Sequence, residues 1–204
     1  MFIRKLLTLF TDILFPPSPE EKILLATKLE DLYSIKQAGT FRQIEYLYRY
    51  SEPVIKTAIL ENKFHHNHTA AKLLGGALEK WVAKQTQNTI YIPIPLGKKR
   101  LRERGHNQVE TILQSTQTKI NISNNLLRRK VETAPQSHLD KKARLENMQD
   151  VFEFDGAKLD FKAGTKIVLV DDVATTGATL LAARASLAPH LPPQTTLTCL
   201  AIAH

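Results

Sequence analysis

The clearest pattern along the chain is an apolar run that ends in two carboxylates and leads into a small, hydroxyl-rich segment. Residues 165–170 end in Ile-Val-Leu-Val, which is typical of a buried strand, and Asp171 and Asp172 follow directly. Helix-forming residues over 177–189 come after the hydroxyl-rich segment. The pattern predicts a strand, a loop and a helix in that order. Open α/β sheets bind ligands where the carboxyl end of a strand meets such a helix.

The spacing of apolar residues predicts further elements along the rest of the chain. Helical spacing favours helices over 53–63, 67–85, 106–118 and 139–147. Short aliphatic runs favour strands over 89–94 and 196–203. Residues 124–137 and 148–164 have weaker patterns, and strand segments there would complete the sheet.

The order of these elements predicts the fold class. Strands that alternate with helices favour an α/β fold, a parallel sheet with helices on both faces. We expect this domain over 53–204 and a small, mainly helical N-terminal appendage over 1–52. Within the appendage, residues 20–50 would hold a helix and a hairpin-like or irregular segment.

The first fifteen residues have the spacing of an amphipathic helix, whose apolar face comprises Ile3, Leu6, Leu7, Phe10, Ile13 and Leu14. Their early positive charge resembles a signal peptide, but Asp12 interrupts the apolar run and no small-residue cleavage site follows. We expect this face to dock on the protein itself, with a membrane surface or a partner as the alternatives. Cys199 is the single cysteine, so no internal disulfide can form, and we expect a cytoplasmic protein.

The segment after the two carboxylates is suited to a phosphate group. Residues 175–179 would present backbone N–H groups at the start of a helix, and Gly177 would let the backbone approach a ligand closely. Threonine hydroxyls can donate further hydrogen bonds. The carboxylates of Asp171 and Asp172 would repel a second phosphate and instead suit the hydroxyls of a ribose or a Mg²⁺ ion. The arrangement predicts a ribose 5-phosphate site.

This stretch resembles the phosphoribosyl-pyrophosphate (PRPP) binding motif of the type I phosphoribosyltransferases. The resemblance implies that Asp171 and Asp172 hold the ribose hydroxyls. It also implies that the loop after them holds the 5′-phosphate, within a PRPP-binding set made up of Asp171, Asp172, Val173, Ala174, Thr175, Thr176, Gly177, Ala178 and Thr179.

Other segments resemble the ComF family of competence proteins in particular. Residues 92–108 contain a Pro-x-Pro turn, a basic segment and then Gly105-His106-Asn107-Gln108, where that family usually has Phe in place of His106. A second segment contributes Thr133, Gln136, Leu139, Arg144, Asn147 and Phe152. The resemblance runs from about residue 53 to the final apolar strand, and residues 14–17 resemble the opening segment of the family.

The ComF resemblance implies a type I phosphoribosyltransferase-like fold that binds PRPP, or a related phosphoribosyl ligand, together with Mg²⁺. ComF-type proteins are associated with DNA uptake in natural transformation, so single-stranded DNA and DNA-processing proteins are further candidate partners. The alternative function is that of an active phosphoribosyltransferase of nucleotide or base salvage. Asp171 and Asp172 would then be catalytic, because they would steady the positive charge that develops on the sugar.

The chain is basic, with a net charge of +8, and its cations are concentrated over 98–104, 128–130 and 141–144. The first group follows a predicted strand end at the same edge as the two carboxylates. Arg100 and Arg104 are therefore candidates for binding a pyrophosphate, and Lys63 is named as a further candidate. The basic surface also suits nucleic acid, although few aromatic residues lie near these runs to stack on bases.

The chain departs from many ComF-type proteins in lacking their four-cysteine zinc module. With Cys199 alone, a tetrahedral Cys₄ site is impossible, and we expect no zinc. His65, His66 and His68 form a small cluster, which we interpret as solvated residues rather than metal ligands.

Overall fold

A computed structural model of the chain describes residues 18–35, 37–130, 151–155 and 164–204. The helices expected over 1–15 and 139–147 lie outside the described residues. The same holds for the cations over 141–144 and for most residues of the second ComF-like segment.

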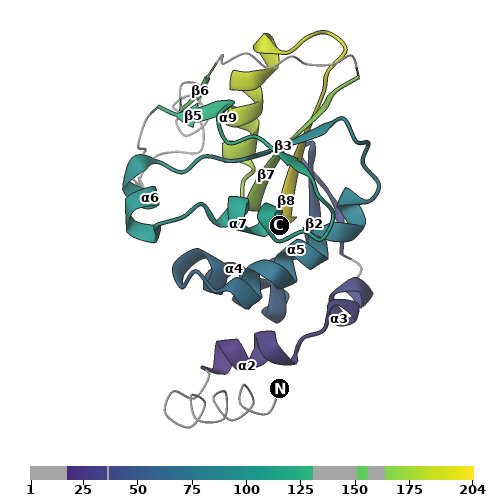
Figure 1. Cartoon of the computed structure of the whole chain (residues 1–204), viewed down its shortest axis with the longest axis vertical. Coiled ribbons are helices and arrows are strands. Elements are labelled where there is room, and N and C mark those ends of the chain that lie inside the picture. Colours follow the sequence, from purple (N-terminus) through teal and green to yellow (C-terminus); the bar gives the residue numbers. More distant parts are fainter. Residues whose placement is uncertain (1–17, 36, 131–150, 156–163) are drawn as a thin grey trace.

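Six described strands form a mostly parallel sheet in the order β1-β2-β8-β7-β3-β4 (Figure 1). Their bounds are β1 Gly39–Phe41, β2 Ile44–Tyr48, β8 Thr196–Ala203, β7 Lys166–Val173, β3 Thr89–Pro93 and β4 Asn121–Ile122. β1 and β2 form an antiparallel hairpin, and each of the other neighbouring pairs is parallel. The central strands β3 and β7 are buried on both faces over most of their length, as expected of parallel strands that are covered on both sides. The predicted α/β class is confirmed.

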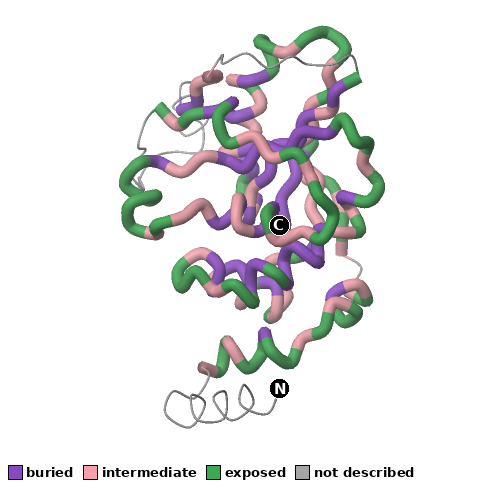
Figure 2. Tube along the Cα trace, viewed as in Figure 1, coloured by how far each residue is buried: buried purple, intermediate pink, exposed green. Residues whose placement is uncertain are grey.

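The side chains of β7 alternate between two hydrophobic cores. Val168 and Val170 pack with α4 (Pro53–Phe64), α5 (His68–Val82) and α7 (Gln108–Gln114). Ile167 and Leu169 pack on the opposite face with α9 (Ala178–Leu187) and the antiparallel pair of β5 (Leu127–Arg129) and β6 (Phe152–Phe154). Figure 2 shows the resulting buried band through the centre of the molecule. Helices therefore cover both faces of the sheet. The side chains of any two consecutive residues of β7 point towards different helical layers.

The N-terminal segment is partly helical and partly a component of the sheet. α2 (Pro19–Ala26) begins at a capping box formed by Ser18 and Glu21, and α3 (Leu29–Ser34) follows it. Both helices lie outside α4 and α5 and bury Leu24 and Leu32 in the same core. β2 pairs with β8 and so extends the central sheet. The central sheet therefore includes residues on both sides of residue 52, where the end of the N-terminal appendage was expected. Among the described helices, none has the length and apolar character needed to cross a bilayer.

Three elements differ from the sequence-based expectation. The strand expected to end at residue 170 continues to Val173, because β8 supplies backbone partners as far as Ala203. The basic segment forms α6 (Lys98–Arg104), which ends at the left-handed Gly105, and α7 then starts from an Asn107 cap. The segments over 124–137 and 148–164 were expected to complete the sheet, but their strands β5 and β6 form a separate two-stranded sheet, and β4, which precedes both segments, lies at the edge instead. The 3₁₀ turn η1 (Ala188–His190) follows α9.

Candidate functional site

The two carboxylates lie at the carboxyl end of β7, next to β3 and β8. Each side chain accepts a hydrogen bond from the backbone N–H of the following residue. Asp172 N donates to Asp171 Oδ1 over 2.9 Å, and Val173 N donates to Asp172 Oδ1 over 2.8 Å. Asp172 is buried, with 4% of its surface exposed, whereas Asp171 is half-buried. The strand thus presents two ordered carboxylates on opposite faces of one edge.

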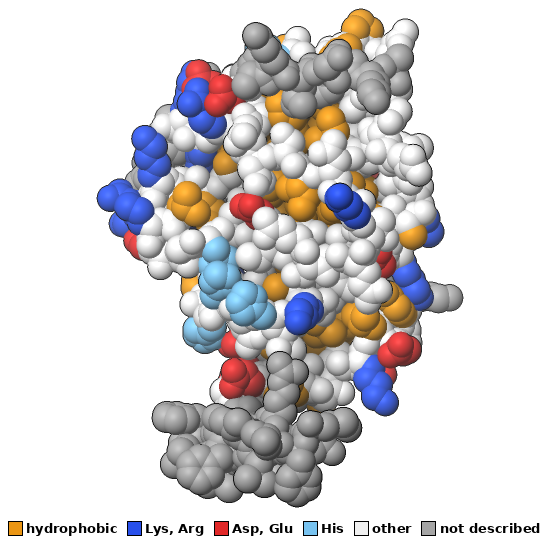
Figure 3. Space-filling model, viewed as in Figure 1, with side chains coloured by type: hydrophobic (Ala, Val, Ile, Leu, Met, Phe, Trp, Pro, Cys, Tyr) orange, Lys and Arg blue, Asp and Glu red, His pale blue; other side chains and the backbone are white. Residues whose placement is uncertain are grey.

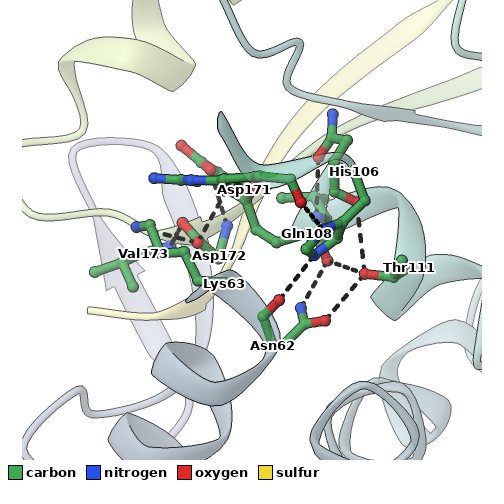
Figure 4. A network of polar contacts seen from close by, with 11 residues as sticks. Asn62, Lys63, His106, Gln108, Thr111, Asp171, Asp172 and Val173 are labelled. Atoms are coloured by element: carbon green, nitrogen blue, oxygen red, sulfur yellow. Dashed lines mark hydrogen bonds and ion pairs between the residues drawn. The ribbon is translucent and has the colours of Figure 1, made fainter. Parts of the chain in front are cut away.

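Buried Asp172 is held by two side chains from the helical layer (Figure 4). Lys63 Nζ, from the end of α4, lies 3.4 Å from Asp172 Oδ2, and Gln108 Nε2, from the start of α7, donates to the same oxygen over 3.2 Å. A buried charge needs such partners, because desolvation without them costs several kcal/mol. Lys63, named above as a pyrophosphate candidate, therefore lies in contact with Asp172.

Of the two predicted arginines of α6, Arg104 lies close to Asp172. Arg104 donates to Gln108 Oε1 over 3.1 Å, so it is linked to Asp172 through one amide. Burial lowers the pKa of Arg104 and the nearby charge of Arg100 adds to this effect, whereas the carboxylate of Asp172 raises the pKa. Arg100 is exposed on α6. Of the three cations predicted for a pyrophosphate, Lys63 contacts Asp172, Arg104 is linked to it through Gln108, and Arg100 lies near Arg104.

The environment of Asp171 disfavours its charged form. Burial and then the adjacent carboxylate of Asp172 raise the pKa of Asp171 well above its ordinary range, while Lys63 acts in the opposite direction. Two neighbouring carboxylates of this kind are typical of functional sites, because a hydroxyl donor or a cation relieves their repulsion.

The loop after β7 is anchored at both ends and exposed in the middle. Ala174 N donates to the carbonyl oxygen of Ala203, and Nδ1 of His204 donates to the carbonyl oxygen of Ala174 over 2.6 Å. Gly177 is buried and adopts a left-handed conformation, with φ +75°. Thr175 and Thr176 between them are exposed, and α9 begins directly after the loop at Ala178. The loop therefore presents its threonines to solvent at a helix N-terminus.

A polar network behind Asp172 includes residues that sequence reasoning missed. Asn62 Nδ2 donates to the carbonyl oxygen of Gln108 over 2.9 Å, and Thr111 Oγ1 donates to Asn62 Oδ1 over 3.1 Å. The ring nitrogens of His106 lie 2.9 Å from the carbonyl oxygen of Arg104 and 2.8 Å from that of Asn62. The ring therefore lies between the end of α6 and the end of α4 and is within hydrogen-bonding distance of both. This network fixes the start of α7, where Gln108 meets Asp172.

The other histidines gather beside this network. The rings of His66 and His106 stack at 3.9 Å between centroids, and His66 also contacts His68 at 5.1 Å. Desolvation, then His106 and His68, lower the pKa of His66. Figure 3 shows histidines clustered on one face next to the basic region of α6. Within the ranges that the structure describes, no group of three or more His, Cys, Asp or Glu side chains is arranged to hold a metal ion.

An open hollow lies next to the histidines, away from the acid pair. It runs between α2 and the end of α4, and Leu25, Phe64 and His65 are among its lining residues. Neither carboxylate of the acid pair nor any residue of the 174–177 loop lines it. The hollow is therefore distinct from the candidate phosphate site.

The other basic run is compensated locally. Beside the β5–β6 sheet, Arg128 lies 3.1 Å from Asp155 and Lys130 lies 3.6 Å from Glu153. In α6, Lys99 lies 4.0 Å from Glu103, and Lys98, Arg100 and Arg102 are exposed. Among the described residues, the more concentrated positive surface is therefore that of α6.

Comparison with known proteins leaves the family open. No protein-family model matches the chain, and no curated protein sequence matches it either. The resemblance to the ComF family thus depends on the motifs quoted above, and the function has to be argued from the site.

Proposed function

We propose that the chain is a ComF-like protein with a type I phosphoribosyltransferase-like domain. In this proposal it binds PRPP, or a related ribose 5-phosphate ligand, together with Mg²⁺ and serves DNA uptake. One observation carries the proposal. Two adjacent carboxylates end the central parallel strand, and an exposed threonine loop at a helix N-terminus follows them directly. This is the place and the chemistry that α/β folds use for sugar phosphates.

The ribose would occupy the acid pair. A carboxylate offers about four lone-pair positions. Asp171 uses one of them on the N–H of Asp172. Asp172 uses its own on Val173, Gln108 and Lys63. Positions therefore remain for neutral donors, and two ribose hydroxyls would supply them without adding negative charge.

The phosphates would occupy the two sides of the acid pair. The 5′-phosphate suits residues 174–178, where the helix start and the hydroxyls of Thr175 and Thr176 favour an anion. The pyrophosphate suits Lys63, which contacts Asp172, Arg104, which is linked to it through Gln108, and Arg100, which lies near Arg104. Bidentate donation by arginine matches phosphate oxygens well.

The acid pair also fits a Mg²⁺ ion that arrives with a polyphosphate. Mg²⁺ takes oxygen ligands, commonly one or two carboxylates plus substrate phosphates and water. The carboxylate of half-buried Asp171 is such a ligand, and its raised pKa is relieved by a nearby cation. When bound, the ion would supply charge neutralisation to the pyrophosphate.

If the protein is also a transferase, its own residues would act by position and charge. A nucleophile would attack the anomeric carbon, and the bond to pyrophosphate would break with both electrons leaving on the pyrophosphate. Asp171 and Asp172 would stabilise the positive charge on the sugar, while Lys63 and Arg104 would stabilise the leaving group.

Calorimetric titration with PRPP, with and without Mg²⁺, tests the proposal. We expect Mg²⁺-dependent binding by the wild-type protein and at least a tenfold loss in an Asp171→Asn/Asp172→Asn variant, since two charged hydrogen-bond acceptors disappear. Asp31→Asn is the matched control, because Asp31 is an exposed carboxylate on α3. Release of pyrophosphate with candidate acceptors then separates an enzyme from a binding protein. No binding of PRPP by the wild-type protein would refute the proposal.

A second activity is favoured by the exposed cations of α6. Lys98, Arg100 and Arg102 form a short basic surface near the site (Figure 3). Such a surface attracts the phosphate backbone of single-stranded DNA. In this proposal DNA binding uses α6, while the phosphoribosyl ligand occupies the acid pair.

A further inference from the structure

The turn of the β1–β2 hairpin packs directly on the loop after β7. Arg42 Nη1 donates to the carbonyl oxygen of Thr176 over 3.3 Å. A Cβ built on Gly177 would lie 2.5 Å from Ile44 Cδ1, so the first residue of β2 touches the loop backbone. Gln43 Oε1 accepts from Arg184 of α9 over 3.3 Å. The turn is therefore held against both the loop and the helix that follows it.

The hairpin is also fixed at the opposite end of the loop. The ring of Phe41 stacks on His204 with 4.1 Å between centroids, and Nδ1 of His204 donates to the carbonyl oxygen of Ala174. Residues 41–44 thus contact, directly or through His204, both anchored ends of the loop, at Ala174 and Gly177.

Both residues of this turn have a strained, left-handed backbone conformation. Arg42 and Gln43 have φ values of 49° and 65°, as a two-residue hairpin turn of type I′ requires. Asn-Gly is the sequence that adopts this turn without strain, whereas ordinary residues in the left-handed region cost about 1–2 kcal/mol each. Strained backbone conformations cluster at functional sites, so the strain at Arg42 and Gln43 favours a functional role for this turn.

We propose that Arg42 binds the 5′-phosphate of the ligand at the 174–177 loop. This inference rests on the function proposed above. A guanidinium has five N–H donors, and its contact with Thr176 accounts for one of them. Its position beside the start of α9 places a full positive charge where the helix already favours an anion.

The assignment divides the cations of the site between two phosphate groups. Lys63 comes from α4 and contacts Asp172, and Arg104 comes from α6 and is linked to Asp172 through the amide of Gln108. Arg42 comes from the edge hairpin and meets the loop after β7. Arg42 would therefore select for ligands that carry a 5′-phosphate and leave the pyrophosphate to the other cations.

Separate titrations with ribose 5-phosphate, PRPP and inorganic pyrophosphate test the proposal. In Arg42→Ala, we expect ribose 5-phosphate and PRPP to bind about 10- to 100-fold more weakly, the range for the loss of a charged hydrogen bond, and pyrophosphate to bind as before. Arg42→Lys keeps the charge and should recover part of the loss. Gln43→Ala is the matched control, because it removes the neighbouring contact of the same turn without changing charge.

The possible results have distinct meanings. Equal losses in Gln43→Ala and Arg42→Ala, with no recovery in Arg42→Lys, would overturn the proposal and leave Arg42 as an anchor of the hairpin. Unchanged affinity of Arg42→Ala for a PRPP that the wild-type protein binds would overturn it while the proposed function survives. If the wild-type protein binds neither PRPP nor ribose 5-phosphate, the inference and the proposed function fail together.

Discussion

Substitution of Gly177 by alanine tests how the hairpin and the phosphate-binding loop are joined. Gly177 combines a positive φ of +75° with close contact to Ile44. An alanine there has to adopt the left-handed conformation and also place its Cβ against the Cδ1 of a side chain that has 0% of its surface exposed. We therefore expect Gly177→Ala to destabilise the protein and to weaken binding of any ligand at the loop.

Two contributions set the size of this effect. The left-handed conformation costs a non-glycine residue about 1–2 kcal/mol. Pushing a buried side chain out of a packed core adds about 1–3 kcal/mol. The free energy of unfolding should thus fall by about 2–5 kcal/mol, which is a large part of the roughly 5–15 kcal/mol typical of a domain.

Urea unfolding of four variants separates the two contributions. Gly164→Ala is the matched control, because Gly164 has φ +78° and a Cβ built there meets no atom within 4 Å. Its cost should be the conformational one alone. Ile44→Val removes Cδ1 and costs about 0.5–1.5 kcal/mol by itself. Combined with Gly177→Ala it should cost less than the sum of the two single changes, by about 1 kcal/mol or more.

The reasoning fails if the two glycine variants lose the same stability, or if the double variant is strictly additive. In either case Ile44 would not determine the position of the loop. Titration with PRPP adds an independent readout, since Gly164→Ala should bind like the wild-type protein and Gly177→Ala should not.

Three further predictions concern charge. Lys63→Met should lower the free energy of unfolding by about 1–3 kcal/mol. This is less than for a fully buried ion pair, because 25% of the Lys63 side chain is exposed. In a double-mutant cycle measured by urea unfolding, adding Asp172→Asn should recover much of the loss. Asp171→Asn should raise the melting temperature at pH 7–8. Because the pKa of Asp171 is raised in the folded state, the wild-type protein loses stability as the pH rises through that pKa. The gain in melting temperature should therefore shrink towards pH 4. A variant that melts at a lower temperature than the wild-type protein at every pH would contradict this prediction. A triple variant that spares Arg100, Lys98→Ser/Lys99→Ser/Arg102→Ser, should bind single-stranded DNA with a weaker salt dependence. The slope of log K against log salt concentration should fall by about 0.7 for each phosphate that α6 no longer neutralises, and the affinity for PRPP should stay unchanged. An unaltered slope would exclude α6 as the DNA-binding surface.

The strand, loop and helix around the acid pair could be predicted because their determinants are local. The aliphatic run of β7, the adjacent carboxylates and Gly177 are contiguous, and each restricts the backbone by itself. Lys63 was named without a positional argument, and its contact with Asp172 depends on the packing of α4. The parallel sheet followed from the alternation of elements, and the approach of Arg104 to the acids followed from its place after a strand end. These inferences needed only the rule that the carboxyl ends of parallel strands meet at one edge.

The remaining parts depend on contacts between distant segments. Nothing in the sequence near Asn62 or Gln108 indicates that an amide will meet Asp172, since that requires α4 and α7 to pack side by side. The hairpin was missed as a part of the sheet because its turn, Arg42-Gln43, lacks the Asn-Gly signature, and its pairing joins residues 44–48 to residues 199–203. The extension of β7 to Val173 depends on the same partner strand, β8.

On the proposed function, the contact between Lys63 and Asp172 couples the two halves of the ligand. A pyrophosphate that attracts Lys63 would leave a buried carboxylate without its cation, which is costly when nothing replaces it. A ribose hydroxyl that donates to Asp172 would offset this loss, and the amide of Gln108 would hold the carboxylate meanwhile. PRPP presents both groups at once, whereas ribose 5-phosphate and pyrophosphate present one each. The affinity for PRPP should therefore exceed the value expected from the separate affinities for ribose 5-phosphate and pyrophosphate. Lys63→Met should remove this excess affinity, and it should weaken the binding of ribose 5-phosphate much less.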